Sequence, residues 1–140
     1  MALEGVGALD ALPADHRWLF ARHTTIADGP YRKRFDDTMH AHAGADRLDR
    51  YFAAQCLKDD TMAESIADAL ERRRPNPPLV LHISGGFHID GNLGLYTCLR
   101  ERLPKERIAT VRIVAVEDLG SADVPRWEHE ADWVIFVKAP

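Results

Sequence analysis

The stretch "LHISGGFHIDGNLG", from Leu81 to Gly94, passes from an apolar run into four glycines with His88 among them. The preceding residues lengthen the apolar run to "PLVLHIS" (78–84), which turn-forming residues bound on both sides. A short apolar run of this kind predicts a buried β-strand, and the glycine pair after it predicts a tight turn. The stretch therefore favours an α/β fold with a loop at the end of a strand.

In the rest of the second half, a predicted helix and two predicted strands follow one another. The segment "LGLYTCLRERL" (93–103) is typical of a helix, and "ATVRIVAVE" (109–117) and "DWVIFVK" (132–138) are typical of strands. Strands and helices in this order predict a small, mainly parallel sheet with covering helices. Strands this apolar are normally buried on both faces, and three strands leave poorly protected edges. We therefore expect either further chain or a partner subunit beside them.

The first half has a helical pattern throughout. Pro13 and Asp15 can start a short helix, "ADGP" (27–30) interrupts it, and two longer helices are expected over residues 31–43 and 46–73. We predict a single domain over residues 1–140, with a helical segment 1–75 and an α/β segment 76–140.

Composition excludes several classes of function. The net charge of −4 provides no basic surplus for phosphates, so nucleic acid is not an expected partner. No apolar run reaches the roughly 20 residues that span a bilayer. The first residues lack the basic and apolar regions of a secretory signal, and the compartment is not predicted.

The long helix places two polar side chains on its apolar stripe. At 100° per residue, Gln55 and Asp59 fall in the middle of a face that includes Phe52 and Cys56, whereas Asp60 falls outside it. A carboxylate on a buried face needs a hydrogen-bond donor, a cation or a water-filled cleft. Asp59 is thus either a structural hydrogen-bonding residue or a functional one, and Cys56 is expected to be a small buried apolar residue.

The glycine loop does not match the known phosphate-binding spacings. It lacks GxxxxGK[ST], and its glycines do not fit GxGxxG. Ligand sites in parallel sheets gather at the carboxyl ends of strands, so Gly85 and Gly86 would turn His88 into a cleft there. The alternative is that His88 is a polar residue with ordinary structural hydrogen bonds.

Two segments together resemble a known family. "YFAAQCLKDDTMAESIADAL" (51–70) followed by "LVLHISGGFHIDGNLGLYTCLRERLP" (79–104) is similar to the ChaN-like haem-binding, iron-regulated proteins, whose helix motif precedes a GxxH loop. The resemblance places Gln55, Asp59 and Met62 in the helix motif. It also makes Gly85 and His88 the ends of the GxxH, although Met62 could equally be core filler.

The resemblance also reveals a difference. ChaN-like proteins usually open with a strand and a "GE.H" motif, and this chain resembles only the C-terminal half of that larger fold. An activity that needs both halves would require a missing N-terminal half or a homodimer. Family members are often exported lipoproteins that serve iron uptake.

Three functions follow. The first is a haem- or iron-related binding domain whose cleft lies at the GxxH loop beside the Gln55/Asp59 helix. The resemblance makes His88 and Tyr96 its candidate iron ligands, with Tyr31 and Tyr51 as weaker ones, although Tyr96 could be an ordinary helix residue.

The second function is a metal-dependent hydrolase, as in the Tiki, TraB and erythromycin esterase-like members of the superfamily, in which His88 and Asp59 would hold a divalent cation. Two ligands are too few for a catalytic site, so we assign no enzymatic activity to this chain alone. The third is a non-catalytic assembly module.

Overall fold

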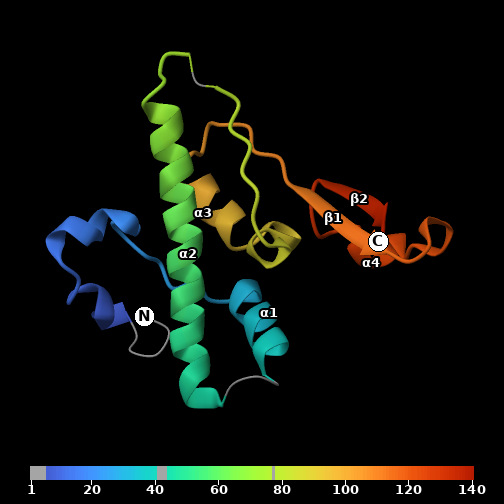
Figure 1. Cartoon of the computed structure of the whole chain (residues 1–140), viewed down its shortest axis with the longest axis horizontal. Helices are drawn as coiled ribbons and strands as arrows, with labels where there is room; N and C mark the ends of the chain where they lie inside the picture. Colours follow the sequence, from blue (N-terminus) through green and yellow to red (C-terminus); the bar gives the residue numbers. More distant parts are fainter. Residues whose placement is uncertain (1–5, 41–43, 77) are drawn as a thin grey trace. The chain divides into compact units, whose positions relative to one another are not determined.

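The computed structural model describes residues 6–40, 44–76 and 78–140. The chain divides into two compact units, Met1–Val80 and Leu81–Pro140. The first is helical and the second contains the strands (Figure 1). This mixed architecture with a parallel sheet confirms the predicted α/β class.

The first unit is organised around one long helix, α2, which spans Ala45–Glu71. Helix α1, Pro30–Met39, packs against it, and two 3-10 helices precede them at Val6–Leu9 (η1) and Ala14–Leu19 (η2) (Figure 1). Pro30 occupies the first turn of α1, where its missing N–H costs nothing. The two longer predicted helices are confirmed, although residues 41–43 of the first prediction lie outside the described residues.

An aromatic cluster joins α1 to α2. Phe52 of α2 has no exposed surface, and its ring centroid lies 5.7 Å from that of Tyr31 and 5.1 Å from that of Phe35. The guanidinium of Arg32 lies over the same ring at 5.1 Å. Tilted aromatic pairs at these distances add to the free energy of burial, so Phe52 is the centre of this core.

An extended segment, residues 20–28, runs along α2 without a strand partner among the described residues. Three of its backbone N–H groups donate instead to side chains of the helix, and we call these three hydrogen bonds the side-chain ladder. The N–H of Ala21 donates to Thr61 Oγ1 at 3.1 Å, that of Arg22 to the Glu64 carboxylate at 3.2 Å, and that of Thr25 to Asp60 Oδ2 at 2.8 Å. Backbone donors need partners, and in this segment α2 supplies them.

The ladder corrects the prediction for Asp60. Helical periodicity placed this residue outside the buried stripe, but it is only 1% exposed. The reason is that residues 20–28 cover a second face of α2, which periodicity within one helix does not reveal. Asp59, predicted on the buried stripe, has no exposed surface, and Cys56 is buried as expected.

The second unit contains two strands. Strand β1, Val111–Val116, pairs in parallel with β2, Trp133–Lys138, so that Val111 lies opposite Trp133 and Ile113 opposite Ile135. Before the sheet come the 3-10 turns Gly86–His88 (η3) and Asp90–Asn92 (η4) and the helix α3, Leu95–Arg102; between the strands lie η5, Leu119–Ser121, and α4, Val124–Trp127.

The two faces of this sheet differ in exposure. One face presents only apolar side chains, and all of them are exposed: Val111, Ile113, Ala115, Trp133, Ile135 and Val137. The other face includes Val114, which is 7% exposed, and Arg112, which packs on Trp127 of α4. The prediction that these strands are buried on both faces is therefore wrong for the chain by itself.

The prediction of a third strand over residues 78–84 is also wrong. These residues form no regular secondary structure and join no sheet of the described residues, and Leu79, Leu81 and Ile83 are 97%, 83% and 84% exposed. Apolar alternation predicts only that a segment is suited to a strand. Pairing depends on a neighbouring strand, which the local pattern does not specify.

The aromatic core gives a first prediction. Phe52→Ala should lower the free energy of unfolding by about 3–5 kcal/mol, because it removes a fully buried ring and leaves a cavity. Urea denaturation followed by circular dichroism measures the change. Leu79→Ala, at a position that is 97% exposed, is the matched control and should change stability by less than about 0.5 kcal/mol. Equal effects of the two substitutions would contradict this assignment of the core.

Candidate functional site

Asp59 lies at the centre of a buried polar network in the first unit. Tyr31 of α1 donates its hydroxyl hydrogen to Asp59 Oδ2 at 2.5 Å, and Gln55 donates from Nε2 to the Tyr31 hydroxyl at 3.1 Å. Gln55 and Asp59 are one helical turn apart, so both reach the same tyrosine. The predicted polar pair thus forms one chain of hydrogen bonds, and Tyr31 is the member that links it to α1.

This environment alters the acidity of Tyr31. Burial raises the pKa of the phenol above its usual value, and the neighbouring Asp59 carboxylate raises it further by repulsion and by accepting the hydrogen bond. Tyr31 therefore remains a neutral donor at physiological pH. Its hydroxyl is thus engaged with Asp59 and Gln55 within the first unit.

Cys56 lies on the same helix one turn before Asp59 and Asp60. Burial raises the pKa of its thiol to about 11, against a smaller lowering by a hydrogen bond with the backbone of Ala27 and further raising by the two carboxylates. The thiol is thus protonated and shielded. It behaves as the small buried residue predicted from the sequence.

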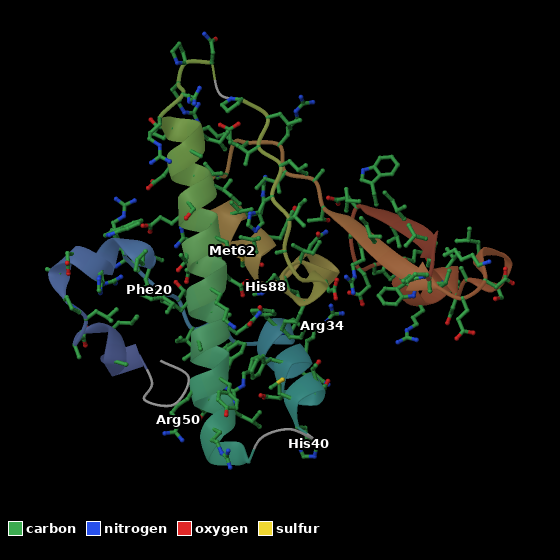
Figure 2. The ribbon with its side chains drawn as sticks, viewed as in Figure 1. Phe20, Arg34, His40, Arg50, Met62 and His88 are labelled. Carbon is green, nitrogen blue, oxygen red and sulfur yellow. The ribbon has the colours of Figure 1, made fainter. Side chains whose placement is uncertain are left out.

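Met62, the third helix-motif residue, is half-buried on α2 (Figure 2). Its neighbour Ala63 has no exposed surface and belongs to the core. Gln55, Asp59 and Met62 therefore all lie on α2 within the first unit, whereas Gly85, Gly86, His88 and Tyr96 lie in the second. That the two groups share one site stays a prediction.

His88 ends a tight turn in the second unit (Figure 2). Its N–H donates to the carbonyl of Gly85 at 3.1 Å, and the N–H of Ile89 donates to Gly86 at 2.9 Å. A Cβ built on Gly85 would lie 3.8 Å from His88 Cδ2, so the imidazole folds back over this glycine. The residues of the GxxH stretch form one compact turn that presents a half-buried histidine.

Residues that precede both strands hold the other end of the loop. The Thr110 hydroxyl donates to Asn92 Oδ1 at 2.7 Å, and the N–H of Gly91 donates to the carbonyl of Glu130 at 2.8 Å. Asp132 in turn accepts from the N–H of Thr110 at 2.7 Å. The loop thus lies at the amino ends of β1 and β2, which corrects the prediction of a loop at the carboxyl ends of strands. That prediction depended on the strand 78–84, which does not form.

Positive φ angles explain the residues after His88. Gly91, Asn92 and Gly94 have φ of 68°, 55° and 53°. Glycine adopts this region without strain, and asparagine tolerates it better than most residues. Sequence reasoning noted the glycines but missed Asn92, although a GN pair is a recognised turn signal.

Tyr96, the other predicted iron ligand, lies in the first turn of α3 and is half-buried. Its N–H donates to the carbonyl of Leu93 at 3.1 Å, which ties the helix start to the end of the loop. Tyr96 and His88 therefore belong to one continuous segment of the second unit.

The described part of the chain contains no group of three or more His, Cys, Asp or Glu side chains arranged to hold a metal ion. Within these same residues no helix has the length and apolarity needed to cross a membrane.

The two units define a small α/β domain with a buried acidic network on its long helix and a histidine turn beside its parallel sheet. Residues 1–99 match the family model described as "Haem-binding uptake, Tiki superfamily, ChaN". The chain belongs to this ChaN-like family, as its motifs suggested. No curated protein and no solved structure gives a significant match.

The network gives a prediction for Tyr31→Phe. Loss of the hydroxyl that donates to a buried carboxylate should lower the free energy of unfolding by about 1–3 kcal/mol near neutral pH. In the folded protein the pKa of Tyr31 lies above the unfolded value of about 10. Its contribution is therefore fully present below pH 10 and is lost as the pH rises above it.

Urea denaturation from pH 7 to pH 11 tests both statements. The wild-type protein should lose more stability above pH 10 than Tyr31→Phe does. Tyr51→Phe, on α2 with Asp59 but outside the network, is the control and should behave like the wild type. Parallel pH profiles for the wild type and Tyr31→Phe would show that Tyr31 ionises normally.

Cys56 gives a separate prediction. In a Cys98→Ser variant the single thiol should not react with Ellman's reagent at pH 8 until urea unfolds the protein, because it is buried and its pKa is about 11. The wild type should show one reactive thiol when folded, that of the half-buried Cys98, and two when unfolded. Rapid reaction of folded Cys98→Ser would overturn this picture of the α2 environment.

Proposed function

We propose that the chain binds haem and that His88 is a ligand to the iron. The observation that supports this most directly is the GxxH turn, which presents a half-buried imidazole in a chain of the haem-binding ChaN family. Histidine is the commonest protein ligand of haem iron in globins and peroxidases.

The residues around His88 suit a flat, apolar ligand. Phe87 and Ile89 flank it in the loop, and both are half-buried. Leu81 and Ile83, on the approach to the loop, expose most of their apolar side chains. A bound haem would supply an iron centre with exchangeable axial positions, and this chain would supply the imidazole and the apolar surface.

Of the tyrosines, Tyr96 is the better candidate for a second ligand. It lies eight residues after His88 at the start of α3 and is half-buried. Tyr31 is excluded from the proposal because its hydroxyl donates to Asp59 and its pKa is raised. Iron favours the phenolate, and forming it beside the Asp59 carboxylate would cost the hydrogen bond between the two side chains.

Haemin titration tests the proposal. The wild-type protein should shift the Soret band at micromolar haemin, and His88→Ala should weaken binding by about 10-fold or more, as expected for loss of an iron ligand. Tyr96→Phe should alter the spectrum if the phenolate occupies the second axial position.

His82→Ala is the matched control, since His82 is an exposed histidine of the same segment, six residues before His88. It should bind haemin as the wild type does. No Soret shift in the wild type, or equal binding by His88→Ala, would refute the proposal.

A further inference from the structure

The His88 loop needs support from outside itself. Four glycines between residues 85 and 94 give the unfolded segment great freedom, and three positions of positive φ must be held in the folded one. The turns at Gly85 and Gly86 span only a few residues. Side chains from the sheet must therefore fix the loop if His88 is to point in one direction.

Arg112 of β1 makes the closest of these supporting contacts. A Cβ built on Gly86 would collide with its guanidinium, with Nη2 at only 2.7 Å. The guanidinium therefore fills the space that any other residue at position 86 would need. A side chain at position 86 would force the guanidinium to move, so glycine here permits the close approach of Arg112.

The same guanidinium also pairs with the far side of the turn. Arg112 Nε lies 3.0 Å from Asp90 Oδ1, and the two side chains are only 26% and 15% exposed. The two atoms are at ion-pair distance without the alignment of a hydrogen bond. Partial burial limits screening of this pair by solvent, so the attraction is stronger than at an open surface.

Trp127 of α4 also contacts the guanidinium of Arg112. Its ring centroid lies 5.6 Å from Arg112 Cζ. A planar guanidinium stacks on an aromatic face in a way that an ammonium cannot reproduce. Arg112 thus touches Gly86 and Asp90, which precede and follow His88 by two residues each, while Trp127 holds it in place.

We infer that Arg112 is a positioning residue for His88. It acts through the loop and touches no ligand itself. Arg112 lies outside residues 1–99, the range that the family model matches. A residue outside that range thus sets the geometry of the GxxH turn within it. Its effect on ligand affinity rests on the proposed function, but its effect on the orientation of His88 does not.

The first test observes His88 directly. The ring ¹³C–¹H signals of His88, identified by their loss in His88→Ala, should shift in Arg112→Lys and in Gly86→Ala. Lysine keeps the charge but loses the planar group, and the alanine methyl displaces that group. The signals of the histidines in the first unit should not move.

Arg126→Lys is the matched control. Arg126 lies over the same Trp127 ring at 5.3 Å, but it is not the partner of Asp90. It should leave the His88 signals unchanged. Unchanged His88 signals in Arg112→Lys would overturn the inference, as would an equal shift in Arg126→Lys.

The second test is a double-mutant cycle on haemin binding. Arg112→Lys should raise the dissociation constant about 10-fold, the size of effect seen for residues that orient a ligand side chain. In the His88→Ala background the same change should have no further effect, because there is no imidazole to orient. A loss of equal size in both backgrounds would show a general structural role and overturn the inference.

The two proposals fail in distinguishable ways. If the wild type binds no haemin, the proposed function is wrong and the His88 signals alone decide the role of Arg112. If haemin binds and needs His88 but Arg112→Lys changes neither the signals nor the affinity, only the inference about Arg112 is wrong.

Discussion

Two adjacent carboxylates buried on α2 constrain the whole first unit. Asp59 and Asp60 are 0% and 1% exposed, and burial of a carboxylate without donors costs several kcal/mol. Each accepts a hydrogen bond from a different segment: Asp59 Oδ2 from the hydroxyl of Tyr31, and Asp60 Oδ2 from the backbone N–H of Thr25. The helix α1 and the extended segment must therefore both lie against α2, on two of its faces.

The hydrogen bond to Asp59 gives the helix pair a defined register. The contacts among Phe35, Phe52 and Tyr31 bury apolar surface, and apolar packing alone tolerates small displacements. A hydrogen bond of 2.5 Å between α1 and α2 does not tolerate them. The apolar core thus holds the two helices together, and the Tyr31–Asp59 pair selects how they align.

The sequence predicted correctly the features that a local pattern or the order of elements determines. The long helix and its buried Asp59 follow from periodicity within one segment, and the parallel sheet follows from the order of strands and helices along the chain. It failed where a second element decides. Asp60 is covered by residues 20–28, and residues 78–84 pair with no strand in the part of the chain that the structure describes.

The candidate site shows the same division. The residues His88, Gln55 and Asp59 could be selected from the sequence because their local patterns are unusual. Tyr31, the partner of Gln55 and Asp59, lies 24 or more residues away along the chain. The residues that hold the loop around His88 are also distant, since Arg112 contacts Gly86 and Asp90, and Thr110 bonds to Asn92 from 18 residues away. Arginine in a strand has no local feature that indicates a glycine as its neighbour in space, so the support of the loop was not predictable.

The side-chain ladder on α2 also differs from the pairing of strands in a sheet, because the acceptors are side chains. A strand in a sheet is recognised by another main chain, whereas the main-chain N–H groups of Ala21, Arg22 and Thr25 donate to the side chains of Thr61, Glu64 and Asp60. Two side chains of the segment add to this, because Arg22 pairs with Glu64 and Asp68 and Ala21 is buried. Proline is the residue that all three positions exclude, since it has no N–H to donate.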